Sequence, residues 1–220
     1  MIAIREFAHA PLLLTLVLST FGLNAVAVIF QTWGYIIATP TAAGLGYGLD
    51  LRVEDIALFV SLYSLFSFIG GLVTGRALRT IRPGWVTIAI FVIAAAGYAI
   101  ALLSFTNVTG FAIGAGLIAL AGGSVYGLVY TMVAFNAPRE RQASTAAAVT
   151  VGGNVGGALI PVIWLTVLNS SATYVDGAPV YSAGALGTVF ALSIIVALLM
   201  VGIGVLLLRV RQPSAPQPTR

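Results

Sequence analysis

Six long apolar segments, separated by short connections, constrain the fold of this chain more than any other feature of its sequence. A helix needs about 20 mostly apolar residues to cross the hydrocarbon core of a bilayer. Each segment meets that length, so we expect an all-α membrane protein whose single transmembrane domain covers residues 1–210. The predicted spans are residues 11–37, 56–75, 85–105, 111–135, 143–168 and 184–208.

The composition argues against several classes of function. Only 7% of the 220 residues are charged, whereas a soluble domain carries about 25%. The chain has no cysteine and one histidine, so we expect neither a metal site nor a cofactor. It has no phosphate-binding loop, zinc-protease motif or nucleophile elbow, so we do not expect an enzyme. All ten basic residues are arginines at segment ends, which indicates contact with a lipid bilayer and no nucleic-acid binding.

The arginines predict the orientation of the chain, because cytoplasmic loops are enriched in basic residues. One set of segment ends carries nine arginines against two acids, and the other carries one arginine against four acids. We therefore expect a multi-pass protein of the cell (inner) membrane with both termini cytoplasmic, and a disordered cytoplasmic tail at 211–220. The first set is Arg5, Arg76, Arg79, Arg82, Arg139, Arg141, Arg209, Arg211 and Arg220, with Glu6 and Glu140.

Glycines mark the second and fifth spans. Spans one to three begin inside and spans four to six begin outside, so a 3+3 inverted repeat would match the second span with the fifth. We expect Gly71 and Gly75 in one, and Gly153 and Gly157 in the other, to let a neighbouring backbone approach closely. Matching glycine interruptions are typical of secondary transporters, although glycine is common in all membrane helices. The third and sixth spans, with Gly202 and Gly204, are expected to face lipid.

Polar residues form stripes on the first, fourth and fifth spans. A polar group in hydrocarbon needs a partner, so these faces should point into the bundle or into a wet cavity. Two interpretations remain open: the residues line a cavity for a small amphipathic solute, or they form interhelical hydrogen bonds of about 0.6 kcal/mol each. No acid lies deep in any span, so a proton-coupled mechanism lacks a titratable group there. The candidate cavity residues are Asn24, Gln31, Tyr126, Tyr130 and Asn154.

Four motifs occur in an order that resembles a known family. They are the loop from Gly71-Leu72-Val73-Thr74-Gly75-Arg76 to Arg82-Pro83-Gly84, then Gly46-Tyr47-Gly48-Leu49, Ala137–Ser144 and the glycine run Gly152–Gly157. Together they resemble the carboxyl-terminal six-helix half of a major facilitator superfamily transporter, in its fourteen-span multidrug-efflux (drug:proton antiporter) branch. Two positions depart from the patterns of that family. Gly75 stands where the amino-terminal half carries an aspartate, which fits the carboxyl-terminal half, and Pro161 follows Leu159-Ile160, whereas the antiporter signature has proline directly after a glycine.

The resemblance implies half of a major facilitator fold, built as a 3+3 inverted repeat. It implies that the first and fourth spans line a cavity and that the second and fifth spans pack on a second six-helix unit. Arg76, Arg79 and Arg82 would form the cytoplasmic loop motif of the family. The partner unit would be another chain or a second copy. The alternatives are a truncated transporter remnant and a non-transporting scaffold or assembly protein, since fold does not fix function.

The predicted topology is testable with reporter fusions. A reporter fused after Gln212 should report the cytoplasm, and one inserted within Ala42–Gly48 should report the exterior, because the basic ends stay inside. An exterior carboxyl terminus would contradict both the orientation and the inverted repeat.

Overall fold

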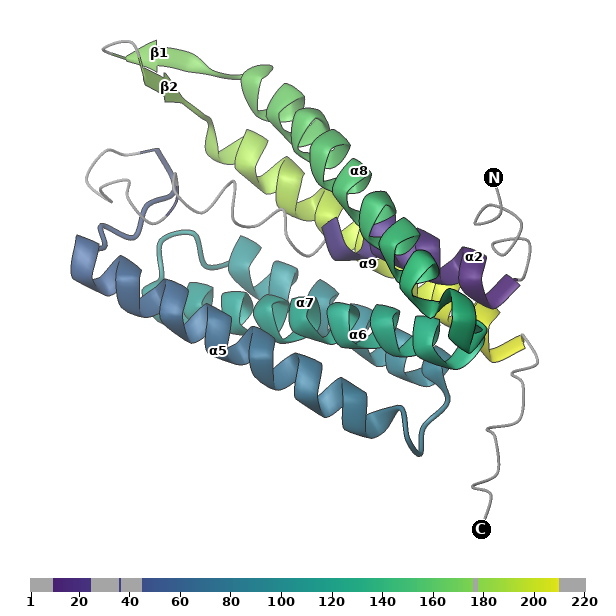
Figure 1. Cartoon of the computed structure of the whole chain (residues 1–220). Coiled ribbons are helices and arrows are strands. Elements are labelled where there is room, and N and C mark those ends of the chain that lie inside the picture. Colours follow the sequence, from purple (N-terminus) through teal and green to yellow (C-terminus); the bar gives the residue numbers. More distant parts are fainter. Residues whose placement is uncertain (1–9, 25–35, 37–44, 176–177, 210–220) are drawn as a thin grey trace.

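The computed structural model describes residues 10–24, 36, 45–175 and 178–209, which form a bundle of long helices with one small strand pair (Figure 1). Within these ranges five helices are long and apolar enough to cross a membrane. The prediction of an all-helical, multi-pass membrane protein is confirmed at this level. The elements are α2 (Ala10–Val17), η1 (Leu18–Gly22), α5 (Val53–Ala77), α6 (Pro83–Leu102), α7 (Val108–Asn136), η3 (Arg139–Arg141), α8 (Gln142–Asn169), β1 (Thr173–Val175), β2 (Ala178–Val180) and α9 (Ala183–Arg209).

The helices coincide with five of the predicted spans, from the second to the sixth. Of the first span, the structure describes an apolar helix over Pro11–Gly22. Residues 25–35, which include Gln31, and the tail at 211–220 lie outside the described residues. A small strand pair accompanies the helices and leaves the fold all-α. Its antiparallel strands flank Asp176-Gly177, a dipeptide that favours two-residue hairpin connections.

Local sequence explains where the helices begin and end. Pro83 opens α6, where its missing N–H costs no hydrogen bond and its fixed φ suits a first helical residue. Asn107 caps α7, because its side-chain oxygen accepts a hydrogen bond of 3.0 Å from the N–H of Gly110. The first turn of α5 holds Glu54 and Asp55 and its last turn holds Arg76, which matches the charges to the helix dipole.

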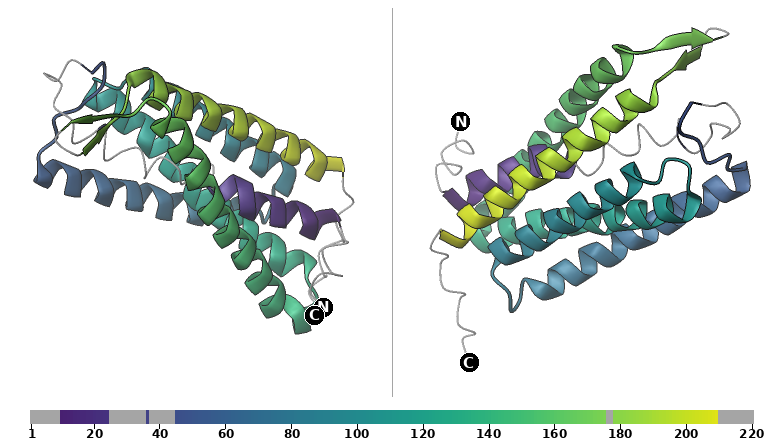
Figure 2. Two further views of the ribbon diagram at one scale, coloured as in Figure 1. Left: turned by 90° about the horizontal axis from the view of Figure 1, so that it is seen from above. Right: turned by 180° about the vertical axis from the view of Figure 1, so that it is seen from behind.

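The long helices pack in the order α5, α7, α6 and α9, and α8 runs diagonally across α2 and η1 (Figures 1 and 2). Aromatic side chains fill the contact between α6 and α9. The ring of Phe190 lies edge-on to the rings of Tyr98 and Phe105, with centroids 5.9 and 5.1 Å apart. The expectation that spans three and six face lipid is therefore wrong for the faces on which α6 and α9 meet.

Glycines set the closest helix contacts, but not all of them at the predicted positions. Between α5 and α7 an added Cβ at Gly70 would collide with the backbone of Leu120, and one at Gly123 with the backbone of Ser67. At Gly71 it would lie in ordinary contact, 3.4 Å from the carbonyl oxygen of Gly123, and at Gly75 it would meet nothing within 4 Å. The structure thus places no described neighbour at Gly75.

In the fifth span, too, the tightest glycine contact is not at a predicted position. The tightest glycine of α8 is Gly156, where an added Cβ would collide with the carbonyl of Thr20. At Gly153 and Gly157 it would lie 3.0 Å from Ser19 Oγ and 3.2 Å from Asn24 Oδ1, which are side-chain contacts. Gly202 has open space as expected. Gly204 does not, since an added Cβ there would lie 3.0 Å from the carbonyl oxygen of Gly84.

A buried loop closes one end of the bundle. Gly46 and Gly48 have φ angles of 76° and 132°, a region that favours glycine. Between them Tyr47 is buried and its hydroxyl donates a hydrogen bond of 3.0 Å to the carbonyl of Tyr181. The N–H of Gly48 donates one of 2.9 Å to the carbonyl of Phe105. The loop before α5 is thereby attached to the connections before α7 and α9.

The basic connections gather at the opposite end. The α5–α6 connection, the α7–α8 connection and the end of α9 lie together there (Figure 1). Of the predicted loop motif, Arg76 is exposed in the last turn of α5, and Arg79 and Arg82 are exposed in the connection that follows. Arg139 and Arg141 are exposed in the α7–α8 connection. The arginine-rich connections of the sequence therefore lie together at one end of the bundle.

Alanine at the tight glycines should destabilise the protein. We expect Gly123→Ala and Gly156→Ala each to lower the free energy of unfolding by about 1–3 kcal/mol, because the added Cβ would overlap a neighbouring backbone. The matched control is Gly202→Ala, which should be neutral or stabilising because alanine favours helix. Unfolding in mixed detergent micelles measures the difference, and equal effects at the three positions would contradict the packing.

Candidate functional site

A cleft of about 480 Å³ lies between η1, α7 and α8. Its lining is mixed, with hydroxyl and amide groups beside apolar and glycine surface. A volume of this size is within the usual range for small-molecule sites. The cleft is lined by Ser19, Leu23, Asn24, Tyr126, Tyr130, Thr150, Gly153, Asn154, Gly157 and Ala158.

The structure brings together the predicted cavity residues that it describes. Asn24 follows η1, Tyr126 and Tyr130 come from α7, and Asn154 comes from α8, and all four line the cleft. Gln31, the fifth predicted residue, lies outside the described residues. Of the predicted packing glycines, Gly153 and Gly157 also line this cleft. Gly71 lines a separate shallow groove between α5 and α7, which Tyr126 borders as well.

A turn of π-helix shapes the η1 side of the cleft. The N–H of Leu23 bonds the carbonyl of Leu18, five residues back, where an α-helix would bond four back. This wider turn brings Ser19 and Asn24, five residues apart, to the same face against α8. Sequence reasoning missed Ser19 because it assumed the α-helical period, which pairs Thr20 with Asn24. Thr150 lies on the same predicted polar stripe of the fifth span as Asn154, but it was not among the candidate cavity residues.

Two side chains tie η1 to α8 by bonding to its backbone. The hydroxyl of Ser19, buried at 2% exposure, donates 2.7 Å to the carbonyl of Val149. The amide nitrogen of Asn24 donates to the carbonyls of Thr20 and Gly153, each at 2.9 Å. Both amide hydrogens of Asn24 are therefore used, and its oxygen keeps its capacity to accept.

Tyr130 and Thr150 form a hydrogen-bond chain across the cleft wall. The hydroxyl of Thr150 lies 2.9 Å from the carbonyl of Ala146 and 3.0 Å from the hydroxyl of Tyr130. A hydroxyl has one hydrogen, and that of Thr150 must go to the carbonyl, which can only accept. Tyr130 then donates to Thr150, and its own oxygen remains an acceptor. The side chain of Tyr130 is 43% exposed.

Pro161 alters the backbone of α8 beside the cleft. Proline has no N–H, so inside a helix it removes the hydrogen bond to the carbonyl four residues earlier. Pro161 lies inside α8, and the carbonyl affected is that of Gly157, which lines the cleft. The carbonyl of Gly157, a residue that lines the cleft, therefore lacks its usual helical donor.

Among the described residues that line the cleft there is no Asp, Glu, Lys, Arg or His. Within the described residues no group of three or more His, Cys, Asp or Glu side chains could hold a metal ion. The site thus offers hydrogen bonds and aromatic surface for binding.

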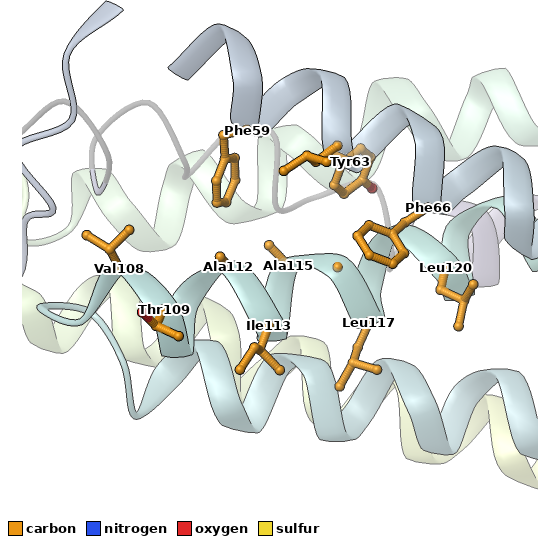
Figure 3. A pocket seen from close by; sticks show the side chains of 12 residues that line it. Phe59, Tyr63, Phe66, Val108, Thr109, Ala112, Ile113, Ala115, Leu117 and Leu120 are labelled. Atoms are coloured by element: carbon orange, nitrogen blue, oxygen red, sulfur yellow. The ribbon is translucent and has the colours of Figure 1, made fainter. Parts of the chain in front are cut away.

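A second cavity, of about 560 Å³, is an apolar groove between α5 and α7 (Figure 3). Phe59, Tyr63 and Phe66 of α5 face Ala112 and Ala115 of α7 across it. Few polar groups converge here, so the groove lacks the orienting contacts that make a specific site. The mixed cleft is therefore the better candidate.

No family model, curated protein or solved structure matches the chain. Its class therefore follows from its own architecture, which is that of a multi-pass membrane protein with several long apolar helices.

Removing the tie between η1 and α8 should have a measurable effect on stability. We expect Ser19→Ala to lower the free energy of unfolding by about 0.6 kcal/mol and at most about 1.7, the range for hydrogen bonds between membrane helices. Ser61→Ala is the matched control, because Ser61 is exposed and bonds only to its own helix at Ala57. Equal unfolding midpoints for the two variants would contradict a contribution from the tie.

Proposed function

We propose that this chain is a six-helix unit of a facilitator-type secondary transporter, which moves small amphipathic molecules together with a second six-helix unit. The observation that carries the proposal is the mixed cleft. Asn24, Tyr130 and Asn154, from three different helices, place polar groups at one site within membrane-spanning segments. Polar groups at membrane depth are costly, and a solute pathway gives them a use.

The order of helix contacts supports a 3+3 inverted repeat. Such a repeat exchanges the first span with the fourth, the second with the fifth and the third with the sixth. The packing of α5 on α7 then corresponds to that of α8 on α2 and η1, and the packing of α6 on α7 to that of α9 on α2 and η1. All of these contacts occur. The repeat also exchanges α6 with α9, so the contact between these two helices corresponds to itself.

A short sequence match supports the same repeat. Residues 19–23, Ser-Thr-Phe-Gly-Leu, in the first span resemble residues 124–128, Ser-Val-Tyr-Gly-Leu, in the fourth span. The two serines also act alike. Ser19 donates to a backbone carbonyl of α8, and Ser124 donates 3.1 Å to the carbonyl of Gly70 in α5.

The exposure of α5 and α8 supports a second unit. Only 11% of the most apolar stretch of α5 and 17% of that of α8 are buried, against 44% in α6 and 56% in α7. Tyr126, 53% exposed, stands between the cleft and the shallow groove. A second unit packed on α5 and α8 would cover this side of the cleft and turn it into a cavity, around which the two units could rock.

The orientation and direction of transport belong to the same proposal. The basic end of the bundle would lie in the cytoplasm of a cell-membrane protein, with both termini there. Export, as opposed to import, follows from the resemblance to multidrug-efflux proteins. We expect that this chain alone does not couple transport to protons, because its predicted spans contain no acidic residue deep in the membrane.

That lack of an acid favours one alternative function, a membrane scaffold or assembly protein that transports nothing. A scaffold requires the helix contacts but not the open polar groups of the cleft. Variants of Asn154, which is exposed to the cleft and has no hydrogen-bond partner within the described part of the chain, therefore discriminate the two.

The proposal predicts association and cleft-dependent movement of solute. Purified in mild detergent, the chain should have a mass of at least two copies or of a complex with another six-helix protein. In vesicles it should accelerate the passage of a slowly permeating amphipathic dye, and Asn154→Leu should reduce that rate about tenfold by removing the amide from the cleft. Tyr174→Phe, on exposed β1, is the control and should transport normally. A stable monomer, or equal rates for Asn154→Leu and the unaltered chain, would overturn the proposal.

A further inference from the structure

Building on the proposed function, we infer that the cleft takes an uncharged solute that donates hydrogen bonds, and that it rejects cations and anions of the same shape. The transport proposal leaves the substrate class open. This class can be inferred from the hydrogen-bonding atoms that the protein has already used and from the charges near the cleft.

The atoms left open in the cleft are mainly acceptors. Asn24 spends both amide hydrogens on the carbonyls of Thr20 and Gly153 and keeps its oxygen. Tyr130 spends its hydrogen on Thr150 and keeps its oxygen. Gly157, which also lines the cleft, has a carbonyl to which Pro161 cannot donate, because proline has no N–H. Ser19 offers nothing, because it is buried and bonded to Val149.

Two groups remain able to donate as well as accept. The hydroxyl of Tyr126 and the amide of Asn154 have no hydrogen-bond partner among the described residues, and both side chains are exposed at the cleft. A solute with hydroxyl or amide hydrogens could meet the open acceptors, and its own acceptor could meet Tyr126 or Asn154. A solute that only accepts would leave most of the cleft unsatisfied, which is costly in a low-dielectric site.

The lack of charged side chains described at the cleft argues against an ionic solute. None of the described lining residues is charged, and the sequence of residues 25–44, which lie mostly outside the described residues, contains no Asp, Glu, Lys, Arg or His. An ion in the cleft would lose its hydration without gaining a counter-charge, and burying an unpaired charge is strongly unfavourable. The faces of Tyr126 and Tyr130 could attract a cation weakly, but this attraction is smaller than the cost of removing the ion from water.

The rings of the two tyrosines define the other part of the solute. Each is about half exposed, at 53% for Tyr126 and 43% for Tyr130, and both line the cleft from α7. Aromatic surface beside acceptor oxygens suits a molecule with a flat apolar body and a polar, hydrogen-donating end. The solute class is therefore neutral and amphipathic, with an amide or hydroxyl group.

Three probes of one shape test the inference. 4-Fluorobenzamide is neutral at pH 7, 4-fluorobenzamidine is a cation and 4-fluorobenzoate is an anion. Their fluorine NMR signals are titrated with the full chain in nanodiscs of zwitterionic lipid, and empty nanodiscs correct for partition into lipid. We expect the amide to bind at least about tenfold more tightly than either ion, a ratio equivalent to about 1.4 kcal/mol.

Two variants locate the binding. Tyr130→Phe removes one open acceptor and keeps the ring, and Asn154→Leu removes the amide, so each should weaken binding of 4-fluorobenzamide about threefold or more. Tyr174→Phe, far from the cleft on β1, should bind as the unaltered chain does. Should either variant fail to fold, the comparison of the three probes on the unaltered chain still decides.

The inference is overturned if 4-fluorobenzamidine or 4-fluorobenzoate binds as tightly as the amide, if the amide does not bind, or if both cleft variants bind it normally. Its failure is distinct from failure of the transport proposal. Binding is measured on the chain by itself, whereas transport is judged by association and by dye movement in vesicles. If the chain bound the amide selectively but neither associated nor moved dye, the inferred ligand class would stand and the transport proposal would be wrong.

Discussion

Close contact between helix backbones is the constraint on which the rest of this structure depends. At Gly123 and Gly156 even one added carbon would overlap the chain of a neighbouring helix. In a bilayer, helices gain little from burying apolar side chains against one another, so van der Waals contact and hydrogen bonds hold them together. Here the two act at the same places. Ser124 reaches the carbonyl of Gly70, and Ser19 reaches that of Val149, only because the helices lie so near.

The same contacts create the cleft. Because α8 approaches η1 at its glycines, Asn24 can bond across to Gly153, and this fixes which of its atoms remain open. Side chains larger than glycine along this line would separate the helices and release the amide hydrogen that Asn24 donates to Gly153, whereas the one donated to Thr20 stays within its own helix. Helix packing therefore decides which hydrogen-bonding atoms the cleft leaves open, and a change in packing would alter that set.

Much of this could be predicted from the sequence, because the signals were long or chemically unusual. Apolar runs of about 20 residues predict spanning helices whatever their partners. Polar residues as rare as Asn24 and Asn154 in such runs indicate a shared interior face. Where prediction failed, local pattern was insufficient. Gly70 and Gly71 are adjacent, and only the rotation of α5 against α7 makes Gly70 the tighter one. The π turn at Leu18–Gly22 has no signal in composition or period, so Ser19 was missed.

The loop around Tyr47 has a mechanical consequence. Hydrogen bonds attach it to Phe105 before α7 and to Tyr181 before α9, so three connections at one end of the bundle are linked to one another. Helices whose ends are joined in this way cannot splay apart at that end without breaking buried hydrogen bonds. The opposite end has the exposed arginines of its connections and only short turns between helices. A large movement of this bundle would then occur most easily as rotation of one rigid body, with the force acting at the basic end.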